Sequence, residues 1–382
     1  MNKEIAFHRA HITDDELNGA VAAIKSGWLT MGPKTVEFEE KFRDYIFAGS
    51  SVPAESRFVV SFNSATAALH LALKAIGLKA GDEVIIPTNT FIATAEVVTY
   101  FGAVPVLCDI EADTHNIDVS KIEALITPRT KALIPVHYGG QMCDMDEIMA
   151  LAKKHGLKVI EDAAHCLPSS YKSRRVGTVG DITCFSFYAT KTLAVGEGGM
   201  AVTTNPDYAK TMKINRLHGI SRDAWDRYTA KGNWFYEVVD NGNKYNTTDV
   251  QSALGLAQLA KLEKMRDMRK RVADIYDKAF DGSAVIRPVI RADRDTSWHL
   301  YYIKVQNRAE LMAKLKESGI STSLHFIPVH RQPYYAAKYG YKVQDYPISE
   351  SVYSRSVSLP IYPDLTDEEA AYVAKKVLQY AK

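Results

Sequence analysis

The sequence predicts an α/β fold with a seven-stranded, mostly parallel sheet, followed by a smaller α+β domain. Short apolar runs of strand length recur through the first two thirds of the chain, and segments with apolar residues at helical spacing separate them. Strands that are apolar throughout are buried on both faces, and helical crossovers join parallel strands. The pattern changes after residue 245, and a chain of 382 residues exceeds the usual size of a single core. Two domains are therefore expected.

The expected elements follow from these periodicities. The strands are residues 58–62, 83–87, 104–108, 131–136, 158–162, 182–187 and 200–204, with helices between them that include 65–76, 93–100 and 145–155. Later come a long helix at 250–280, a strand at 301–305, a helix at 309–318, a strand at 320–324 and helices at 348–357 and 366–380. We assign residues 1–245 to the large α/β domain, whose N-terminal segment need not pack with it, and residues 246–382 to the small domain.

Composition excludes several classes of protein. Lys and Arg number 47 against 45 Asp and Glu, so no overall charge attracts nucleic acid or an anionic membrane. The four cysteines lack the CxxC spacing of zinc sites, which indicates free thiols in a reducing compartment and no metal. The N-terminus lacks a signal-peptide core, and no stretch approaches the ~20 apolar residues that span a bilayer. We expect a soluble, cytoplasmic protein.

Polar residues follow the predicted strands at the edge where an open parallel sheet binds ligands. After the strand at 58–62, the segment SFNSATAALHLAL begins a helix whose free N–H groups, with Ser64 or Thr66, suit a phosphate. An ordinary helix cap has the same pattern. After the strand at 158–162, Asp162 and His165 follow in KVIEDAAHC. Such a carboxylate pairs with a protonated ring nitrogen, contributes to a metal site or caps a helix.

Lys191 follows the strand at 182–187 and precedes the glycine-rich run GEGG. A lysine at a strand end among apolar and small residues has a lowered pKa, which makes its amine a nucleophile toward carbonyl groups. A solvated loop lysine is the alternative. The GxGxxG spacing of dinucleotide-binding folds is absent. Together, an anion-binding helix start, a carboxylate, the hydroxyl of Ser186 and this amine match the needs of pyridoxal phosphate (PLP).

Segments in order along the chain resemble the DegT/DnrJ/EryC1/StrS nucleotide-sugar aminotransferases. They are SGWLTMGPK, SFNSATAALHLAL, PTNTFIAT, VIEDAAHC, SFSFYATK, GEGG, YNTTDVQSALGLAQLAKLE, LHFIPVHRQPYY and SLPIYPDLTDEE. The resemblance spans nearly the whole chain. It implies a homodimeric PLP-dependent transferase of fold type I, with active sites at the subunit interface.

The resemblance also implies roles for individual residues. Lys191 would hold the cofactor covalently and, once released, move a proton between substrate and cofactor, while Asp162 would face the pyridine nitrogen. The other expected residues are Ala65, Thr66 and Ser186 at the phosphate, Asn246 reaching it from the partner subunit, Phe91 and His165 beside the cofactor ring, and His325 and His330 near the sugar. Residues 222–243 and 332–346 are expected to shape the pocket.

The implied reaction moves an amino group from glutamate, through the pyridoxamine form of the cofactor (PMP), to a keto carbon, C4, of a nucleotide-linked sugar. Its products would enter bacterial surface polysaccharide, lipid A or amino-sugar biosynthesis. Two alternatives remain: a sugar dehydratase that uses PLP or PMP, in which histidine replaces the lysine, and a non-catalytic PLP-binding regulator. Lys191 favours transamination over dehydration, and no basic or helix-turn-helix segment supports DNA binding.

Overall fold

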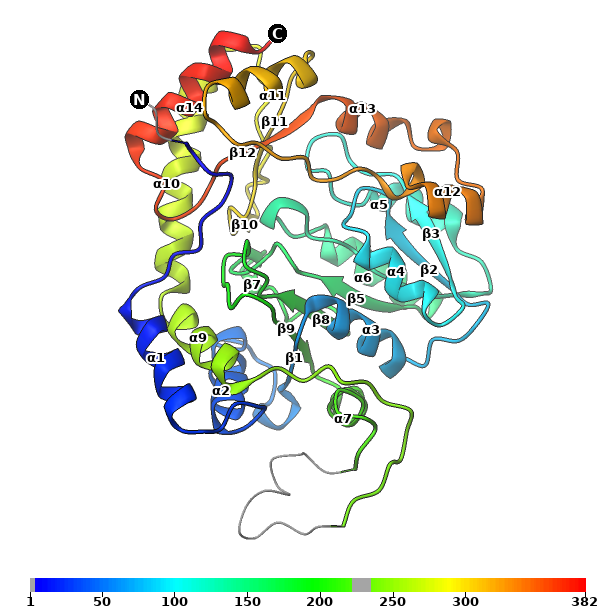
Figure 1. The fold of residues 1–382 in the computed structure, drawn as a ribbon. Helices are drawn as coiled ribbons and strands as arrows, with labels where there is room; N and C mark the ends of the chain where they lie inside the picture. Colours follow the sequence, from blue (N-terminus) through cyan, green and yellow to red (C-terminus); the bar gives the residue numbers. More distant parts are fainter. Residues whose placement is uncertain (1–3, 222–234) are drawn as a thin grey trace.

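The computed structural model describes residues 4–221 and 235–382. Its centre is a seven-stranded sheet in the order β1-β9-β8-β5-β4-β2-β3 (Figure 1). The strands are β1 (Phe58–Phe62), β2 (Glu83–Pro87), β3 (Val104–Cys108), β4 (Thr130–Leu133), β5 (Lys158–Asp162), β8 (Ile182–Ser186) and β9 (Gly199–Thr203). Only β9 is antiparallel to its neighbours. The predicted mostly parallel sheet is confirmed, and the carboxyl ends of β1, β5 and β8 meet at one edge.

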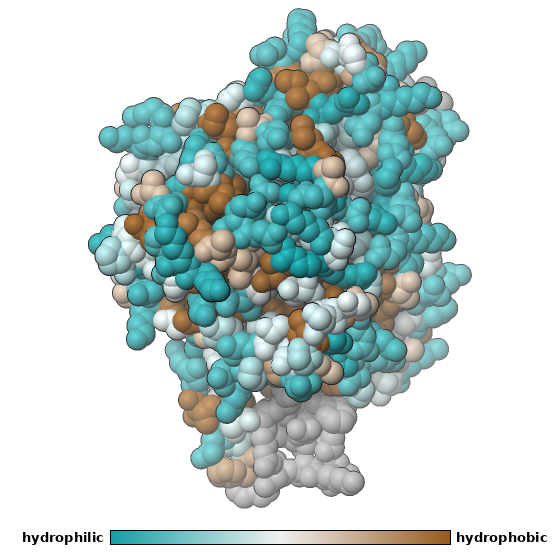
Figure 2. All heavy atoms as spheres, turned by 180° about the vertical axis from the view of Figure 1, so that it is seen from behind, coloured by the Kyte–Doolittle hydropathy of each residue, from teal (hydrophilic) through white to brown (hydrophobic). Residues whose placement is uncertain are grey.

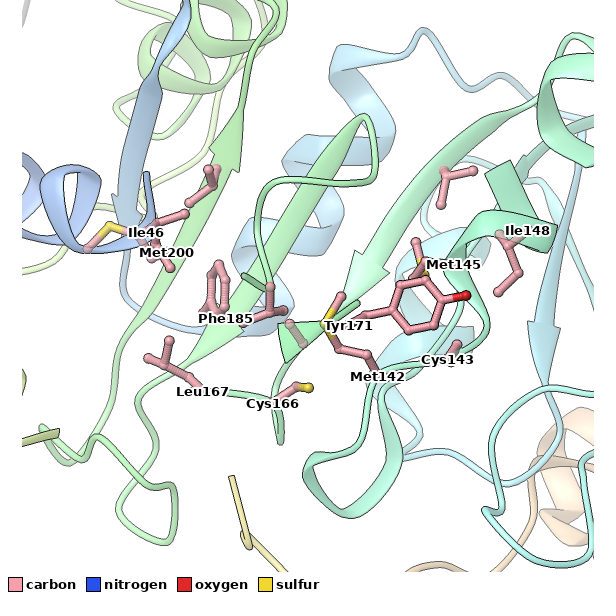
Figure 3. Packing of buried hydrophobic residues seen from close by; sticks show 14 of the residues in the cluster. Ile46, Met142, Cys143, Met145, Ile148, Cys166, Leu167, Tyr171, Phe185 and Met200 are labelled. Atoms are coloured by element: carbon pink, nitrogen blue, oxygen red, sulfur yellow. The ribbon is translucent and has the colours of Figure 1, made fainter. Parts of the chain in front are cut away.

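Alternate residues of the buried strands face two separate cores. In β5, Val159 packs with α2 (Pro33–Ile46) and α6 (Met145–His155), whereas Ile160 packs with α3 (Ala65–Ala75), α4 (Ala93–Thr99) and α7 (Pro206–Asn215). Figure 3 shows the first core, where Phe185 and Met200 of the sheet lie near Ile46. Because side chains of successive strand residues point to opposite faces, helices cover both sides of the sheet.

A second, smaller structure follows the large sheet. Strands β11 (Tyr301–Lys304) and β12 (Ser356–Leu359) pair antiparallel and pack against α10 (Leu262–Phe280), α11 (Arg308–Glu317) and α14 (Asp367–Tyr380). Ile5 of the N-terminal segment belongs to this core and bridges Ile320. The N-terminal segment therefore runs along the small domain before α1 (Asp14–Lys25) begins, and both termini lie at the same end of the molecule (Figure 1). The boundary at residue 245 stays a prediction.

Two expected elements of the small domain were wrong. The long helix at 250–280 is two helices, α9 (Asp249–Ala260) and α10, which separate at Lys261 (φ −117°, ψ 13°). They separate because α9 packs against α1 and α2, whereas α10 continues into the small domain. Residues 320–324 make only isolated bridges, and β12 forms at the expected end of a helix because Val357 and Leu359 pair with β11 and enter the small core.

The remaining elements are short. They are α5 (Val119–Ile122), α12 (Pro333–Tyr339), α13 (Pro347–Arg355), the strands β6 (Ser170–Tyr171), β7 (Arg174–Arg175) and β10 (Arg294–Asp295), and 3₁₀ turns at Ala54–Ser56, Glu123–Leu125, Tyr138–Gly140, Val329–Arg331 and Val343–Asp345. Figure 2 shows a largely hydrophilic surface with separate hydrophobic patches. Within the described ranges, no helix is both long and apolar enough to cross a membrane.

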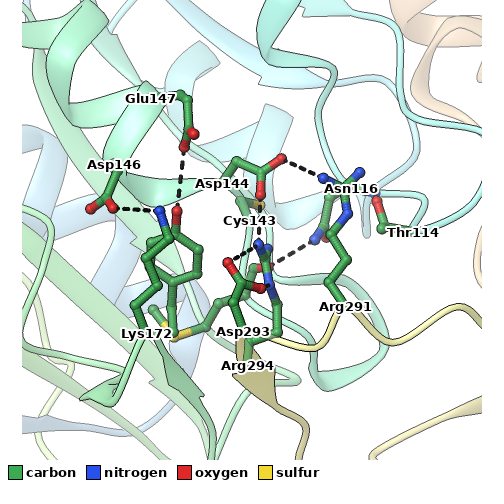
Figure 4. Close-up of polar contacts among 12 residues, drawn as sticks. Thr114, Asn116, Cys143, Asp144, Asp146, Glu147, Lys172, Arg291, Asp293 and Arg294 are labelled. Carbon is green, nitrogen blue, oxygen red and sulfur yellow. Dashed lines mark hydrogen bonds and ion pairs between the residues drawn. The ribbon is translucent and has the colours of Figure 1, made fainter.

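An ion-pair cluster attaches residues 291–294, which precede β11, to the large domain (Figure 4). Asp144, which precedes α6, accepts hydrogen bonds from Arg291 at 3.1 Å and from the buried Arg294 at 2.7 Å. Arg294 also donates to Asp293 and to the carbonyl of Met142, both at 2.7 Å. Buried charged groups satisfied in this way hold the backbone in one position. The cluster therefore fixes the segment that leads to residues 297–300.

Asp249 joins α9 to the start of α2. Its buried carboxylate accepts N–H bonds from Gly32 (2.8 Å), Thr35 (3.0 Å) and Lys34 (3.1 Å), and the Thr35 hydroxyl at 2.7 Å. Asp249→Ala leaves these donors unpaired, so we expect a loss of about 3 kcal/mol in the free energy of unfolding. Denaturant titration measures the loss. Asp274→Ala, at an exposed ion pair, is the matched control, and equal stability of the two variants would contradict the assignment.

Candidate active site

A cavity of about 500 Å³ opens at the carboxyl edge of β1, β5 and β8. The large sheet and its loops supply one wall, and the N-terminal segment and small domain supply the other. Its lining includes Phe7, His8, Ser64, Ala65, Thr66, Thr90, Phe91, Asp162, His165, Ser186, Tyr188, Lys191, Glu197, His299, His325, Phe326 and Ile361. The volume suits a cofactor or small-molecule ligand.

Asp162, the last residue of β5, presents a buried carboxylate to this cavity. Burial raises its pKa, and the hydrogen bonds that it accepts from the Thr94 hydroxyl (2.8 Å) and the Ala164 N–H (3.2 Å) oppose that rise. Its backbone is also fixed, because its N–H donates to the Pro135 carbonyl at 2.9 Å. A carboxylate held in this way favours a cationic partner inside the cavity.

Glu161 points to the opposite face, as the alternation of a strand requires. Its carboxylate is buried and accepts from His137 Nε2 at 2.8 Å, Thr183 Oγ1 at 2.7 Å and the Gly180 N–H at 2.8 Å. The Cys143 N–H donates to His137 Nδ1 at 3.2 Å, so the Nε2 of that ring carries the proton. The strand end thus delivers only Asp162 to the ligand edge, whereas Glu161 braces β5 against its neighbours.

Lys191 lies in the turn after β8 and lines the same cavity as Asp162. Removal of its amine from water lowers its pKa to about 8, and the charge of Asp162 opposes that effect. Near neutral pH, a substantial fraction of the amine is therefore unprotonated, which is the form that attacks a carbonyl carbon.

The start of α3 forms the third part of the site. Ser64 caps the helix by accepting the Ala67 N–H at 3.1 Å, which leaves the N–H groups of Ala65 and Thr66 at the cavity. Gly199 permits β9 to begin against this turn, because a Cβ there would lie 2.4 Å from the Ser64 carbonyl carbon. A helix start with free N–H groups binds phosphate.

Three histidine rings, His165 after β5 and His299 and His325 from the small domain, lie close together at the cavity. The His165 ring lies 4.4 Å from that of His299 and 6.3 Å from that of His325, measured between centroids. Burial and the nearby Lys191 charge lower the pKa of all three, that of His325 to about 3. The Gly139 N–H donates to His165 Nδ1 at 3.4 Å, so Nε2 carries the proton of the neutral ring. This wall therefore presents neutral imidazoles.

The structure brings together most of the residues expected from sequence. Eight line the cavity: Ala65, Thr66, Phe91, Asp162, His165, Ser186, Lys191 and His325. His330 does not, because its buried ring is held between Thr88 Oγ1 (2.5 Å) and Glu350 (2.7 Å). Asn246 is also outside the cavity of its own subunit, and its amide oxygen accepts from Lys244 at 2.5 Å.

Sequence reasoning missed other cavity residues. Phe7, His8 and His299 carry no strand-end signal, because the N-terminal segment and the chain before β11 reach the cavity only through tertiary packing. Residues 235–243 and 332–346 do not line the cavity of this subunit, and residues 222–234 lie outside the described part of the chain. The expectation that the regions 222–243 and 332–346 shape the pocket stays a prediction.

The residues present fit PLP. A carboxylate on β5 suits a protonated pyridine nitrogen, an amine after β8 suits the aldehyde, and the α3 start with Ser186 suits the phosphate. Phe91 is 58% exposed beside the Phe326 ring at 5.8 Å, which leaves a face free for an aromatic cofactor.

The fold and this donor set define a PLP-dependent aminotransferase of fold type I. Residues 10–378 match the model of the DegT/DnrJ/EryC1/StrS aminotransferase family, and the chain belongs to that family.

Individual relatives agree. The chain is 45% identical over 379 residues to SpsC of Bacillus subtilis, a spore coat polysaccharide biosynthesis protein, covering 97% of this chain and 95% of SpsC. Spr1654 of Streptococcus pneumoniae in its PMP form superposes with a TM-score of 0.91 at 33% identity, covering 98% of each chain. PseC of Helicobacter pylori, an aminotransferase involved in pseudoaminic acid biosynthesis, superposes at 0.90 with 29% identity over 99% of each chain.

The lowered pKa of Lys191 is testable without any cofactor. In cofactor-free protein, we expect reductive methylation of Lys191, followed by mass spectrometry of its peptide, to rise through about pH 8. Asp162→Asn removes a charge that stabilises the ammonium ion, so the midpoint should fall below 8. The exposed Lys375 is the control for the reagent. A Lys191 midpoint near the ordinary value for lysine would contradict a buried amine.

Proposed function

We propose that this protein transfers the amino group of glutamate, through PLP, to the C4 keto carbon of a nucleotide-linked sugar. The observation that carries the proposal is the placement of Lys191, Asp162 and the α3 start around one cavity. Bound PLP supplies an electron sink for the substrate carbon that loses or gains a proton. The chain's own residues bind it, hold its charge and move that proton.

Each residue has a task in this proposal. Lys191 anchors the cofactor and, when released, carries the proton to and from the substrate carbon, for which a pKa of about 8 is well matched. Asp162, held by Thr94, keeps its carboxylate toward the pyridine nitrogen. Ala65, Thr66 and Ser186 hold the phosphate, and Phe91 and His165 lie beside the ring. His325 binds the sugar, whereas the position of His330 favours a supporting role.

A sugar is supported as the amino acceptor by the relatives and by the cavity wall. SpsC and PseC act in polysaccharide and pseudoaminic acid biosynthesis, and neutral imidazoles suit hydroxyl groups. The segments SGW, TPRTKALIPVHY, IEDAAH, KYN and LHF are similar to UDP-4-amino-4-deoxy-L-arabinose synthase, which makes an amino sugar for lipid A. Tyr188 and Phe91 stand where that enzyme has histidine and tryptophan, so we propose a different sugar for surface polysaccharide or amino-sugar biosynthesis.

A homodimer completes the proposal. On α1, Leu17, Val21 and Ile24 recur at helical spacing and are 56%, 46% and 55% exposed, whereas Glu16 and Ala23 on the other face are buried. An apolar stripe of this kind is typical of a subunit interface. In the dimer, Asn246 of each subunit would reach the phosphate in the other.

Lys191→Ala tests the central assignment. The wild-type protein with PLP should show the long-wavelength absorbance of a lysine-linked cofactor, which sodium borohydride removes. Lys191→Ala should lack that band and lose at least ~10³-fold in turnover, because the nucleophile and the proton carrier are both absent. Lys375→Ala is the surface control. An unchanged spectrum in Lys191→Ala would contradict the proposal.

Half-reactions distinguish the alternatives. With glutamate, the wild-type protein should release 2-oxoglutarate in step with conversion of PLP to its amine form. A panel of UDP- and dTDP-linked 4-keto sugars should then restore the original band with one preferred substrate. Release of water from the sugar without 2-oxoglutarate formation would indicate the dehydratase instead. Cofactor binding with no turnover on any sugar would indicate the regulator.

Lysine substitutions on the apolar stripe of α1 test the dimer. Leu17→Lys together with Val21→Lys should yield monomers in analytical ultracentrifugation, because two buried lysines per subunit are costly at an apolar interface. Glu40→Lys, on the exposed side of α2, is the control. Monomeric wild-type protein with full activity would overturn both the dimer and the assigned role of Asn246.

A further inference from the structure

His8 connects the N-terminal segment to the turn that carries Lys191. Its Nε2 lies 2.8 Å from the Ala189 carbonyl oxygen, and its ring lines the cavity. A carbonyl oxygen only accepts hydrogen bonds, so Nε2 must carry a proton. In a neutral ring, Nδ1 then has a free lone pair. His8 is thus tethered by one nitrogen and available as an acceptor through the other.

The surroundings of His8 keep its ring neutral. The charged and titratable groups around it are Lys191 after β8, Arg269 on α10 and Tyr362, whose ring packs edge-on at 6.5 Å. Burial and the charges of Arg269 and Lys191 lower the pKa of His8 to about 4. At physiological pH, the His8 ring therefore offers one donor and one acceptor and no charge.

Arg269 is an unusual neighbour. Its side chain is fully buried and donates to the carbonyl of Ile361 at 2.8 Å, and Ile361 lines the cavity. Its Nε has no hydrogen-bond partner, and no ion pair to a carboxylate is present for it among residues 4–221 and 235–382. An unpaired buried cation disfavours folding. Its charge adds to the effect of burial in lowering the pKa of His8.

The wall around His8 suits hydroxyl groups and not anions. Among the described lining residues, Lys191 is the only lysine, and no arginine is present. His165, His299 and His325 also have lowered pKa values. Neutral donors and acceptors recognise a polyhydroxyl ring, whereas a wall without cations is less suited to carboxylates.

We propose that His8 determines specificity for the amino acceptor: tethered to Ala189 through Nε2, it accepts at Nδ1 a hydrogen bond from a hydroxyl of the sugar ring. This inference rests on the proposed function and names the chemistry of the acceptor that this wall recognises. We expect His8 to affect the sugar half-reaction more than the glutamate half-reaction, because a sugar presents several hydroxyl donors and glutamate presents none.

Two substitutions of His8 separate the hydrogen-bond acceptor at Nδ1 from the tether that Nε2 makes to Ala189. A glutamine amide nitrogen reaches the position of Nε2, so His8→Gln keeps the donor to Ala189 and lacks an acceptor at Nδ1. An asparagine amide oxygen reaches the position of Nδ1, so His8→Asn keeps the acceptor and loses the tether. We expect kcat/KM for the keto sugar to fall by about 10-fold to 100-fold in His8→Gln and by less in His8→Asn. A tethering role predicts the reverse order.

The glutamate half-reaction and a deoxy substrate complete this test. Stopped-flow absorbance should show that His8→Gln, which keeps the tether to Ala189, is converted by glutamate at a rate close to that of the wild type. Among deoxy keto sugars, the one that lacks the hydroxyl bound by His8 should bind the wild-type protein more weakly than the full substrate does. His8→Gln should bind this deoxy sugar and the full substrate equally well, and this comparison identifies the hydroxyl. His11→Gln is the control, because His11 lies three residues further on and bonds Asp364 at 2.7 Å outside the cavity.

Arg269→Met tests the neutral imidazole independently of activity. In protein labelled with ¹⁵N at histidine, NMR should show His8 neutral above about pH 5 in the wild type. Without the Arg269 charge, the pKa of His8 should rise above that of the wild type, although burial still keeps it below 6.5. An unmoved His8 titration overturns the role of Arg269.

The possible failures are distinct. If the wild-type protein neither binds PLP nor reacts with glutamate, the proposed function fails. If both half-reactions proceed and His8→Gln matches the wild type with every keto sugar, the inference about His8 fails while the proposed function stands.

Discussion

The site depends on keeping one amine away from water while a buried carboxylate in the same cavity accepts hydrogen bonds that favour its ionised form. Burial favours the neutral form of both groups: it lowers the pKa of Lys191 to about 8 and raises that of Asp162. The Thr94 hydroxyl and the Ala164 N–H compensate on the acidic side, and the two charges favour each other. A reactive lysine and an acid that is ready for a cation are thereby compatible in one buried cavity.

The large domain meets this requirement mainly through the arrangement of its strands. Parallel strands end at a common edge, so β1, β5 and β8 deliver an anion-binding helix start, a carboxylate and an amine to one place. The alternation of β5 separates Asp162 from Glu161, whose bonds to His137 and Thr183 keep the strand in register. Gly199 permits β9 to lie against the α3 start, where any side chain would collide.

Segments distant in the sequence close the cavity. The ion pairs of Asp144 with Arg291 and Arg294 fix the chain that supplies His299, and the N-terminal segment, packed on the small domain through Ile5, supplies His8. The resulting wall has neutral imidazoles near buried cations. One half of the cavity therefore has the charges that a cofactor needs, and the other half has hydrogen-bonding groups without charge.

The sequence by itself determined the strands of the large sheet and the edge at which ligands bind. It also determined that Lys191 and Asp162 follow strands that end at this edge. These features depend on local periodicity and on which residue follows each strand, and both are readable within about ten positions of the chain. Only the tertiary structure decided that His330 lies outside the cavity, that a helix breaks at Lys261 and that β12 replaces a helix end. It also decided that His8 faces Lys191. Each of these outcomes arises from packing between segments that are distant in the sequence, and local propensity carries no information about such contacts.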